Sequence, residues 1–191
     1  MDLRRAILDA SLDLIAAKGI EALSLREVAR RLKVTHGAPY YHFRDRAAIL
    51  AALTEEGLGL LTAELQAAVA GAKGGALGSF EACGRAYVSF AVTRSAYFKI
   101  IYRPELAGDK HHQAIEKASA CGFQVLLHTV QRCQAEGMCR GVDAYALAMT
   151  GWATAHGLAS LCVDGYLADG TDAAELGQTV ATTLGALIAG A

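Results

Sequence analysis

The sequence lacks most of the residues and patterns that interrupt or cross-link a helical protein. It contains two prolines in 191 residues, which suits long helices, and no segment alternates apolar and polar residues as a half-buried strand does. Its five cysteines are odd in number and include no Cys-x-x-Cys pair. These absences argue against a secreted disulfide scaffold and favour buried thiols in a reducing cytoplasm. A redox pair of Cys133 and Cys139 is the less favoured alternative.

Long apolar runs without polar breaks are also missing. Asp2 and Arg4 interrupt the N-terminal apolar pattern, so the sequence predicts no signal peptide. The most apolar stretch covers residues 144–163, and polar side chains divide it: Thr150, Thr154, His156 and Ser160. We therefore expect a buried helix there and not a membrane span.

The net charge of −1 is close to zero, but the charges are unevenly distributed along the chain. Residues 1–50 carry nine Lys and Arg against six Asp and Glu, a net charge of +3. Residues 51–191 carry the remaining nine basic and thirteen acidic residues, a net charge of −4. A basic segment joined to an acidic body is typical of a DNA-binding module attached to a domain that does not bind DNA, although chance asymmetry gives the same sums.

Helical periodicity and capping residues predict three helices near the N-terminus. An apolar stripe over residues 3–15 predicts the first helix. Ser24 and Glu27 form a capping box at the start of the second helix, which is short. Thr35 is expected to cap a short third helix that ends at Phe43.

The rest of the chain is also predicted to be helical. Asp45 is expected to cap a long fourth helix that ends near Gly71, and a loop follows over residues 72–78. Beyond the loop, apolar periodicity predicts five helices at residues 79–94, 96–102, 110–136, 143–164 and 172–189. Asp143 and Asp172 are the expected N-caps of the last two. The sequence therefore predicts an all-α protein.

The second and third predicted helices, with the break at Lys33 between them, form a helix-turn-helix unit. In such a unit the second helix lies in the major groove of DNA. Its first turn here contains Gly37 and Ala38, which have no long side chain and permit a close approach to the groove. Ala38 suits contact with a thymine methyl group, and His36 suits a hydrogen bond with a base edge. The residues that follow suit hydrogen bonds to phosphates: Tyr40, Tyr41 and His42.

Four further residues are expected to contact DNA. Ser24 and Thr35 lie at predicted helix N-termini, where a hydroxyl and free backbone N–H groups face a phosphate. Arg26 is placed to reach a base or a phosphate, and Arg46 to reach the backbone. The alternative is that the aromatic residues only pack a small module.

These motifs resemble the TetR family of transcriptional regulators. The resemblance covers residues 3–55 and is carried by Ala6-x3-Ala10-x3-Leu14, Lys18-Gly19, Leu25-x2-Val28-Ala29, Val34-Thr35 and Tyr40-Tyr41-His42-Phe43. It implies a three-helix DNA-binding domain over residues 1–46 and a helical effector-binding and dimerisation domain over residues 47–191. It also implies a homodimer on a pseudo-palindromic operator, and a repressor released by a small-molecule effector.

The chain departs from the family pattern at two positions. Lys33 occupies a turn position where glycine is commoner, and a lysine there with a positive φ costs about 1 kcal/mol. Pro39 stands inside the third predicted helix, where a bulky aliphatic residue is usual. Late in the chain, Trp152-x3-His156-Gly157 resembles a signature of one subgroup of the family.

Aromatic residues of the middle helices are expected to line an effector pocket, although most of them also suit a core. The expected pocket residues are Tyr87, Phe90, Phe98, Tyr102, His128, Trp152 and His156. The last two predicted helices carry small residues that permit close helix contact. With the resemblance, they predict a dimer interface made by Leu147, Gly151, Ala155, Leu158, Val180, Leu184 and Leu187.

Two other classes of protein fit the sequence less well. An enzyme is disfavoured because no Gly-rich phosphate loop, G-x-S-x-G or H-E-x-x-H motif is present. Asp109, His111 and His112 have donor atoms for a metal but suit a solvated loop better, so no metal or cofactor is expected. The main alternative is a helical small-molecule-binding protein without DNA-binding activity, whose affinity for DNA would show no steep salt dependence.

Overall fold

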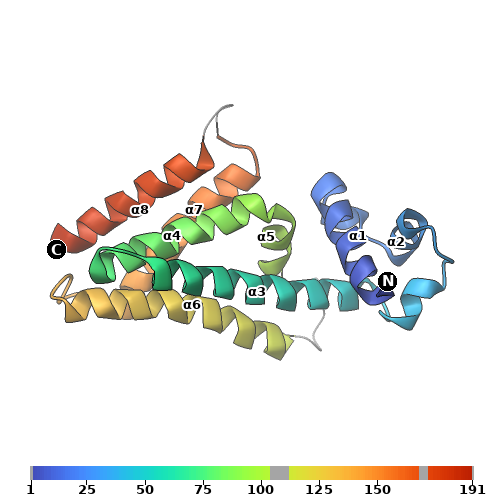
Figure 1. The fold of residues 1–191 in the computed structure, drawn as a ribbon, viewed down its shortest axis with the longest axis horizontal. Helices are drawn as coiled ribbons and strands as arrows, with labels where there is room; N and C mark the ends of the chain where they lie inside the picture. The colour runs from blue at the N-terminus through green and yellow to red at the C-terminus, as the bar shows by residue number, and fades with distance from the viewer. Residues whose placement is uncertain (1, 104–111, 168–171, 191) are drawn as a thin grey trace. The chain divides into compact units, whose positions relative to one another are not determined.

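The structure is a computed structural model in which residues 2–103, 112–167 and 172–190 are described. Within these residues it contains eight α-helices, two 3-10 helices and no strand, so the all-α prediction is confirmed (Figure 1). The helices are α1 (Leu3–Lys18), η1 (Ile20–Ala22), α2 (Leu25–Leu32), η2 (Ala38–Tyr41), α3 (Arg46–Gly71), α4 (Gly75–Thr93), α5 (Ser95–Ile101), α6 (His112–Ala135), α7 (Ala144–Val163) and α8 (Ala173–Gly190).

The chain divides into two compact units. Unit 1 consists of residues 1–58 and 94–118, and unit 2 consists of residues 59–93 and 119–191. The helices α3 and α6 therefore each contribute to both units. The compact units differ from the two domains predicted from the sequence, which divide the chain after residue 46: α5 belongs to the same compact unit as α1 and α2. The division after residue 46 stays a prediction about which part binds DNA and which part binds the effector.

In unit 1, helices begin at N-cap residues that can be recognised in the nearby sequence. The Oγ of Ser24 accepts a hydrogen bond from the Glu27 amide at 3.2 Å and begins α2. A carboxylate oxygen of Asp45 accepts one from the Ala48 amide at 2.9 Å at the start of α3. The expected N-caps at Ser24 and Asp45 are confirmed. Large apolar side chains such as Ile7 and Ile49 are fully buried in this unit.

Lys33 ends α2 in the left-handed conformation, with φ 56° and ψ 37°. The Val34 amide donates to the Ala29 carbonyl at 3.1 Å, and the Lys33 amide donates to the Arg30 carbonyl at 3.2 Å. These two bonds form a Schellman motif, whose left-handed residue is usually glycine. A side chain with a Cβ costs about 1–2 kcal/mol in this conformation, so Lys33 is strained.

The third predicted helix is wrong in type. The segment forms a 3-10 helix over Ala38–Tyr41, and Gly37 takes the capping position expected for Thr35. Pro39 has no amide hydrogen and cannot donate to the Thr35 carbonyl as an α-helix requires. The Ala38 amide donates to that carbonyl instead at 3.0 Å, and the Tyr40 amide donates to the Gly37 carbonyl at 3.1 Å. Both bonds join residues three apart, so the helix is tighter.

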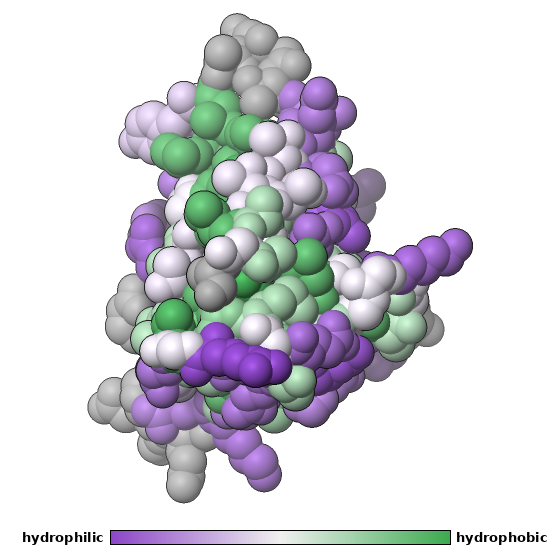
Figure 2. All heavy atoms as spheres, turned by 90° about the vertical axis from the view of Figure 1, so that its left-hand side faces the viewer, coloured by the Kyte–Doolittle hydropathy of each residue, from purple (hydrophilic) through white to green (hydrophobic). Residues whose placement is uncertain are grey.

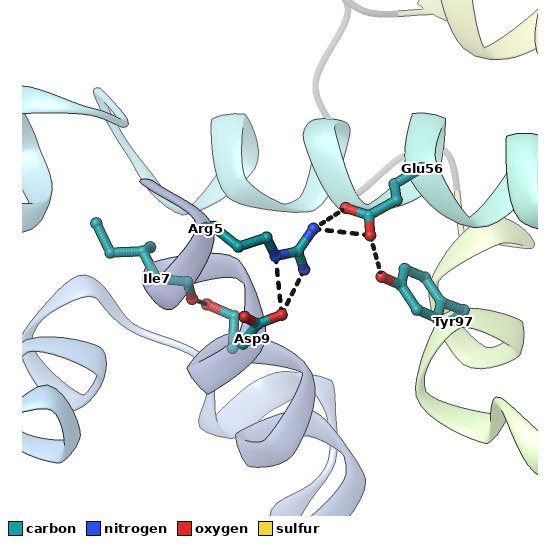
Figure 3. Close-up of polar contacts among 6 residues, drawn as sticks. Arg5, Ile7, Asp9, Glu56 and Tyr97 are labelled. Carbon is teal, nitrogen blue, oxygen red and sulfur yellow. Dashed lines mark hydrogen bonds and ion pairs between the residues drawn. The ribbon is translucent and has the colours of Figure 1, made fainter. Parts of the chain in front are cut away.

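A polar cluster joins α1, α3 and α5 inside unit 1 (Figure 3). A terminal guanidinium nitrogen of Arg5 donates to both carboxylate oxygens of Glu56 at 2.7 and 2.8 Å, and Nε donates to Asp9 at 2.9 Å. The Tyr97 hydroxyl donates to Glu56 at 2.7 Å. Gly57 permits this approach, because a Cβ there would lie 2.8 Å from the Tyr97 ring.

Unit 2 is centred on α4, which packs against α7 and α8 (Figure 1). Glycines allow these contacts: a Cβ on Gly151 would lie 3.4 Å from the Phe80 ring, and one on Gly177 would lie 3.4 Å from Val88. The expected N-caps of α7 and α8 are confirmed, since Asp143 accepts from the Ala146 amide and Asp172 from the Ala174 amide, each at 2.8 Å.

The helix α4 begins at Gly75, four residues before its predicted start. Its first turn is capped from a distance, because both carboxylate oxygens of Glu136 accept from the Ala76 amide, at 3.2 and 3.3 Å. No residue near Gly75 in the sequence announces this cap. The predicted loop over residues 72–78 is therefore wrong in its second half.

Candidate DNA-binding interface

The segment after α2 exposes the side chains that were expected to contact DNA. Tyr40 and Tyr41 have 52% and 90% of their surface exposed. The other exposed members of the segment are Thr35, His36, Gly37 and His42, while Ala38 is half-buried. Two adjacent exposed aromatic residues mark a candidate interaction surface, whereas exposed tyrosines that stand alone, such as Tyr166, need no such explanation.

Two other residues of the segment face inward and fix its path. Pro39 is buried and Phe43 is 4% exposed, four residues apart. The Arg4 guanidinium carbon lies 5.2 Å from the centre of the Phe43 ring, a cation–π contact that ties the segment to α1. Pro39 thus takes a buried, core-facing position in the segment. Because Pro39 and Phe43 are held in the core, the side chains of Tyr40 and Tyr41 stay exposed.

Most basic side chains of residues 1–50 already have an acidic partner. Nitrogen–oxygen distances of 4.0 Å or less join an acid to six of the nine: Arg5, Lys18, Arg30, Arg31, Arg44 and Arg46. Arg4 lies over Phe43. Within the described part of the chain, Arg26 and Lys33 are exposed and have no acidic partner, so they are the cations most open to a phosphate.

Ser24 and Arg46 form hydrogen bonds within unit 1 in addition to their expected contact with DNA. The Ser24 hydroxyl oxygen caps α2. A terminal nitrogen of Arg46 donates to the Ile20 carbonyl at 2.8 Å and lies 3.6 Å from Glu21. Both residues therefore hold unit 1 together, and their contact with a phosphate stays a prediction.

Three of the seven expected effector-pocket residues meet in a hydrogen-bonded cluster of unit 2. The Tyr87 hydroxyl lies 2.8 Å from Nδ1 of His156 and accepts from the Trp152 indole N–H at 3.3 Å. Burial lowers the pKa of His156, which favours the neutral ring. Phe123 packs edge-on against Trp152 at 6.3 Å between ring centres. This arrangement fits the alternative interpretation, in which these residues belong to the core of the subunit and do not line an effector pocket.

The other four expected pocket residues lie elsewhere. Phe90 is fully buried, and Phe98 packs edge-on against Tyr102 in unit 1, with ring centres 5.4 Å apart. His128 is exposed on α6, and its place in an effector pocket stays a prediction. The spacing of residues along one helix does not predict which side of that helix packs against a neighbouring helix and which side faces solvent.

An open groove of about 410 Å³ lies on unit 2. It is lined by Ala68, Gly71, Ala72, Lys73, Ala82, Arg85, Ala86 and Ser89. None of the seven expected pocket residues lines it. Among the described residues, no group of three or more His, Cys, Asp and Glu is placed to hold a metal ion, and Asp109 and His111 lie outside the described residues.

The expected dimer-interface residues are divided between the inside and the outside of unit 2. Gly151, Ala155 and Leu158 are buried within the single chain, and their place in a dimer interface stays a prediction. Small residues permit close helix contact, but here their partner is α4 of the same chain. Leu147, Val180 and Leu184 are half-buried, and Leu187 is 66% exposed.

The helix α7 is only partly buried, contrary to the sequence-based expectation. By length and composition it is the one helix among the described residues that could cross a membrane, a test that core helices of soluble proteins also pass. Its outer side carries Ala146, Thr150, Ala153, Gly157 and Leu161, all exposed. On the face drawn in Figure 2, which looks toward the end of α8, hydrophobic and neutral residues form a band with hydrophilic borders.

The two cysteines considered as a redox pair are buried. Burial raises the pKa of the Cys133 thiol to about 11, so it stays protonated at neutral pH. The Cys139 thiol donates to the Ile188 carbonyl at 3.2 Å and ties the segment after α6 to α8. These surroundings favour a structural role for both residues.

Family models match both parts of the chain. The N-terminal model of the tetR family of bacterial regulatory proteins matches residues 7–53, and the tetracyclin repressor-like C-terminal domain matches residues 80–184. The chain belongs to the TetR family. The match over residues 7–53 contains the exposed tyrosine segment, and the match over residues 80–184 contains the Tyr87 cluster.

Individual relatives of this TetR-family chain agree with the family models. The regulator AcrR of Shigella flexneri is 39% identical over 67 residues, which cover 34% of this chain and 31% of AcrR. The class A tetracycline repressor of Escherichia coli is 43% identical over 49 residues, which cover 26% of this chain and 23% of the repressor. A Rhodococcus protein of unknown function has a solved structure that is 34% identical, with a TM-score of 0.85 over 99% of this chain and 96% of that one.

The TetR-family pattern did not reveal the Arg5–Glu56–Tyr97 cluster. Its members come from three helices, and 41 residues separate Glu56 from Tyr97. The only signal in the sequence is the presence of charged residues on otherwise apolar helices. Such a signal does not say which charges meet.

Proposed function

We propose that this protein is a sequence-specific DNA-binding transcriptional regulator. The observation that carries the proposal is the exposed segment Thr35–His42, in which Tyr40 and Tyr41 point away from a core that holds Pro39 and Phe43. Hydroxyl and imidazole groups at such positions suit phosphates, and the small residues before them suit close approach to base edges. The proposal assigns base contacts to His36, Gly37, Ala38 and Arg26, and phosphate contacts to Ser24, Thr35, Tyr40, Tyr41, His42 and Arg46.

We further propose that the regulator acts as a homodimer on a two-fold symmetric operator. The outer sides of α7 and α8 carry small or apolar exposed residues, among them Leu161 and Leu187. A stable dimer would remove this surface from water and place two copies of the DNA-binding segment on one duplex. Light scattering at micromolar concentration tests the proposal, and a monomer would contradict it.

The sign of regulation and the effector belong to the same proposal. Because the chain belongs to the TetR family and resembles a tetracycline repressor over 49 residues, we propose a cytoplasmic repressor released by a small-molecule effector. We assign the chain to the subgroup with the Trp-x3-His-Gly signature, because Trp152, His156 and Gly157 match that signature. Adding an effector should lower the affinity for DNA by the same factor as DNA lowers the affinity for the effector.

Selection from random duplex DNA tests the central claim. Wild type is expected to enrich a two-fold symmetric site, with binding that weakens steeply as salt is raised. Tyr40→Ala should weaken binding, whereas Tyr166→Ala serves as a control, because Tyr166 is 78% exposed in unit 2. No enrichment and no salt-dependent binding would favour the alternative, a helical small-molecule-binding protein without DNA-binding activity.

A further inference from the structure

Lys33 combines a strained backbone with an exposed side chain that has no hydrogen bond or ion pair within the described part of the chain. Its φ of 56° places it in the conformation that glycine adopts without strain. The side chain is exposed, and no hydrogen bond or ion pair involves it within the residues that the structure describes. The left-handed residue therefore costs stability relative to glycine, and no bond of its side chain within the described residues offsets that cost.

The charges around Lys33 show what kind of partner is missing. Arg30 and Arg31, on the preceding turn of α2, lie 2.5 Å from Glu27 and 3.6 Å from Asp13. Lys33 follows them and has no acidic partner among the described residues, and the exposed Thr35 and His36 lie two and three residues further along the chain. A cation at this place suits an anion that comes from outside the chain, and it lies two residues before Thr35, the first residue of the proposed DNA-binding segment.

We propose that Lys33 binds a phosphate of the DNA backbone and is a positioning residue for the complex. The inference rests on the proposed DNA-binding function and adds a contact to it. A lysine ammonium is a mobile point charge without the fixed geometry that reads a base, so Lys33 contributes affinity and register but no sequence preference. The strained turn holds the charge beside the exposed segment, at the cost of stability that glycine would not incur.

Lys33→Gly tests the proposal, because it should separate stability from binding. The variant removes the left-handed strain and the charge together, so its Tm should equal or exceed that of wild type. Its affinity for DNA should fall about tenfold at low salt. The slope of log K against log salt should become shallower by about 0.9 for each Lys33 in contact, or about 1.8 for a dimer.

The measurement uses a fluorescent duplex of mixed sequence as well as any site enriched by selection, since a phosphate contact acts on both. Lys33→Arg keeps the charge and should keep the slope. Lys73→Gln removes the same charge from unit 2 and should leave the slope unchanged.

Each outcome supports or overturns a specific claim. A shallower slope in Lys33→Gly with a slope in Lys33→Arg that matches wild type supports the phosphate contact. Wild-type binding with an unchanged slope in Lys33→Gly overturns the contact and leaves the proposed function intact. If wild type itself shows no salt-dependent binding to either duplex, the proposed function fails and the contact with it.

Discussion

The same residue type serves opposite purposes in the two units. In unit 1, Tyr40 and Tyr41 are exposed, and no side chain of the described residues bonds to their hydroxyls. In unit 2, Tyr87 is 6% exposed, and its hydroxyl contacts both Trp152 and His156. The difference shows that chemistry alone does not assign an aromatic residue to a binding surface, since its neighbours decide whether its polar group is available.

This contrast divides substitutions into two classes. A change inside the hydrogen-bonded cluster of unit 2 should alter the free energy of unfolding, whereas a change in the exposed segment of unit 1 should alter DNA affinity with little effect on stability. Pairs of identical substitutions in the two units therefore test the comparison directly.

The largest expected effect comes from a pair of glycines. In Gly78→Ala, the new Cβ would collide with the Lys73 carbonyl oxygen, so the backbone before α4 must move. We expect a loss of about 3 kcal/mol in the free energy of unfolding. In Gly37→Ala, the new Cβ meets no atom within 4 Å, and stability should change by less than about 0.5 kcal/mol.

Urea unfolding and DNA titration of both glycine variants distinguish the two units. Gly37→Ala should weaken DNA binding, because the added methyl group lies on an exposed segment that must approach the groove. If Gly37→Ala unfolds as easily as Gly78→Ala, or binds DNA as wild type does, the contrast between the units is wrong at this position.

The next effect concerns the tyrosine hydroxyls. Tyr87→Phe removes the acceptor of the Trp152 N–H and the partner of His156, and should cost about 1–3 kcal/mol of stability. Tyr41→Phe removes an exposed hydroxyl and should leave the Tm unchanged while DNA affinity falls several-fold. Thermal unfolding of both variants with a DNA titration checks the pair, and equal Tm values for the two would contradict it.

A smaller effect is expected at the polar cluster of unit 1. Glu56→Gln keeps the size of the side chain and an oxygen for the Tyr97 hydroxyl but removes the charge that faces Arg5. Because Arg5 also bonds to Asp9 and both partners are partly exposed, the loss should be about 0.5–1 kcal/mol. Burial raises the pKa of Tyr97 to about 12, so its hydroxyl remains a donor in the variant. A loss above 3 kcal/mol in urea unfolding would show that the cluster is tighter than its exposure indicates.

The helix ends explain how much of the fold the sequence predicts. Ser24, Asp45, Asp143 and Asp172 each cap an amide two or three residues away, so a local pattern reveals them. The start of α4 depends on Glu136, which lies 60 residues from the amide that it caps, and no local pattern contains that information.

The candidate sites follow the same rule. The exposed segment of unit 1 was predicted by its order of cap, turn and aromatic residues, although Pro39 changed its helix from α to 3-10. The pocket and interface residues of unit 2 were predicted by residue type alone. Residue type did not show that Gly151 packs on α4 or that His128 faces solvent, because both depend on which helices meet.

The smallest expected effect is the pH dependence of stability that His156 contributes. Burial lowers the pKa of His156 below its ordinary value of 6.5, so near that pH the unfolded chain binds more protons than the folded chain. Stability from the neutral ring is therefore present above about pH 6.5 and decreases as the pH falls toward the folded pKa. Protonation makes both ring nitrogens donors, so Nδ1 can then only donate to the Tyr87 hydroxyl.

His156→Gln isolates this contribution, because a glutamine amide can either donate a hydrogen bond to the Tyr87 hydroxyl or accept one from it, but does not titrate between pH 5 and 8. The Tm of wild type should fall more steeply than that of His156→Gln as the pH is lowered from 7 to 5. The exposed His128→Gln on α6 is the matched control and should follow wild type. Parallel Tm curves for wild type and His156→Gln would show that the buried cluster of unit 2 does not sense pH, and the contrast with the exposed residues of unit 1 would then rest on packing alone.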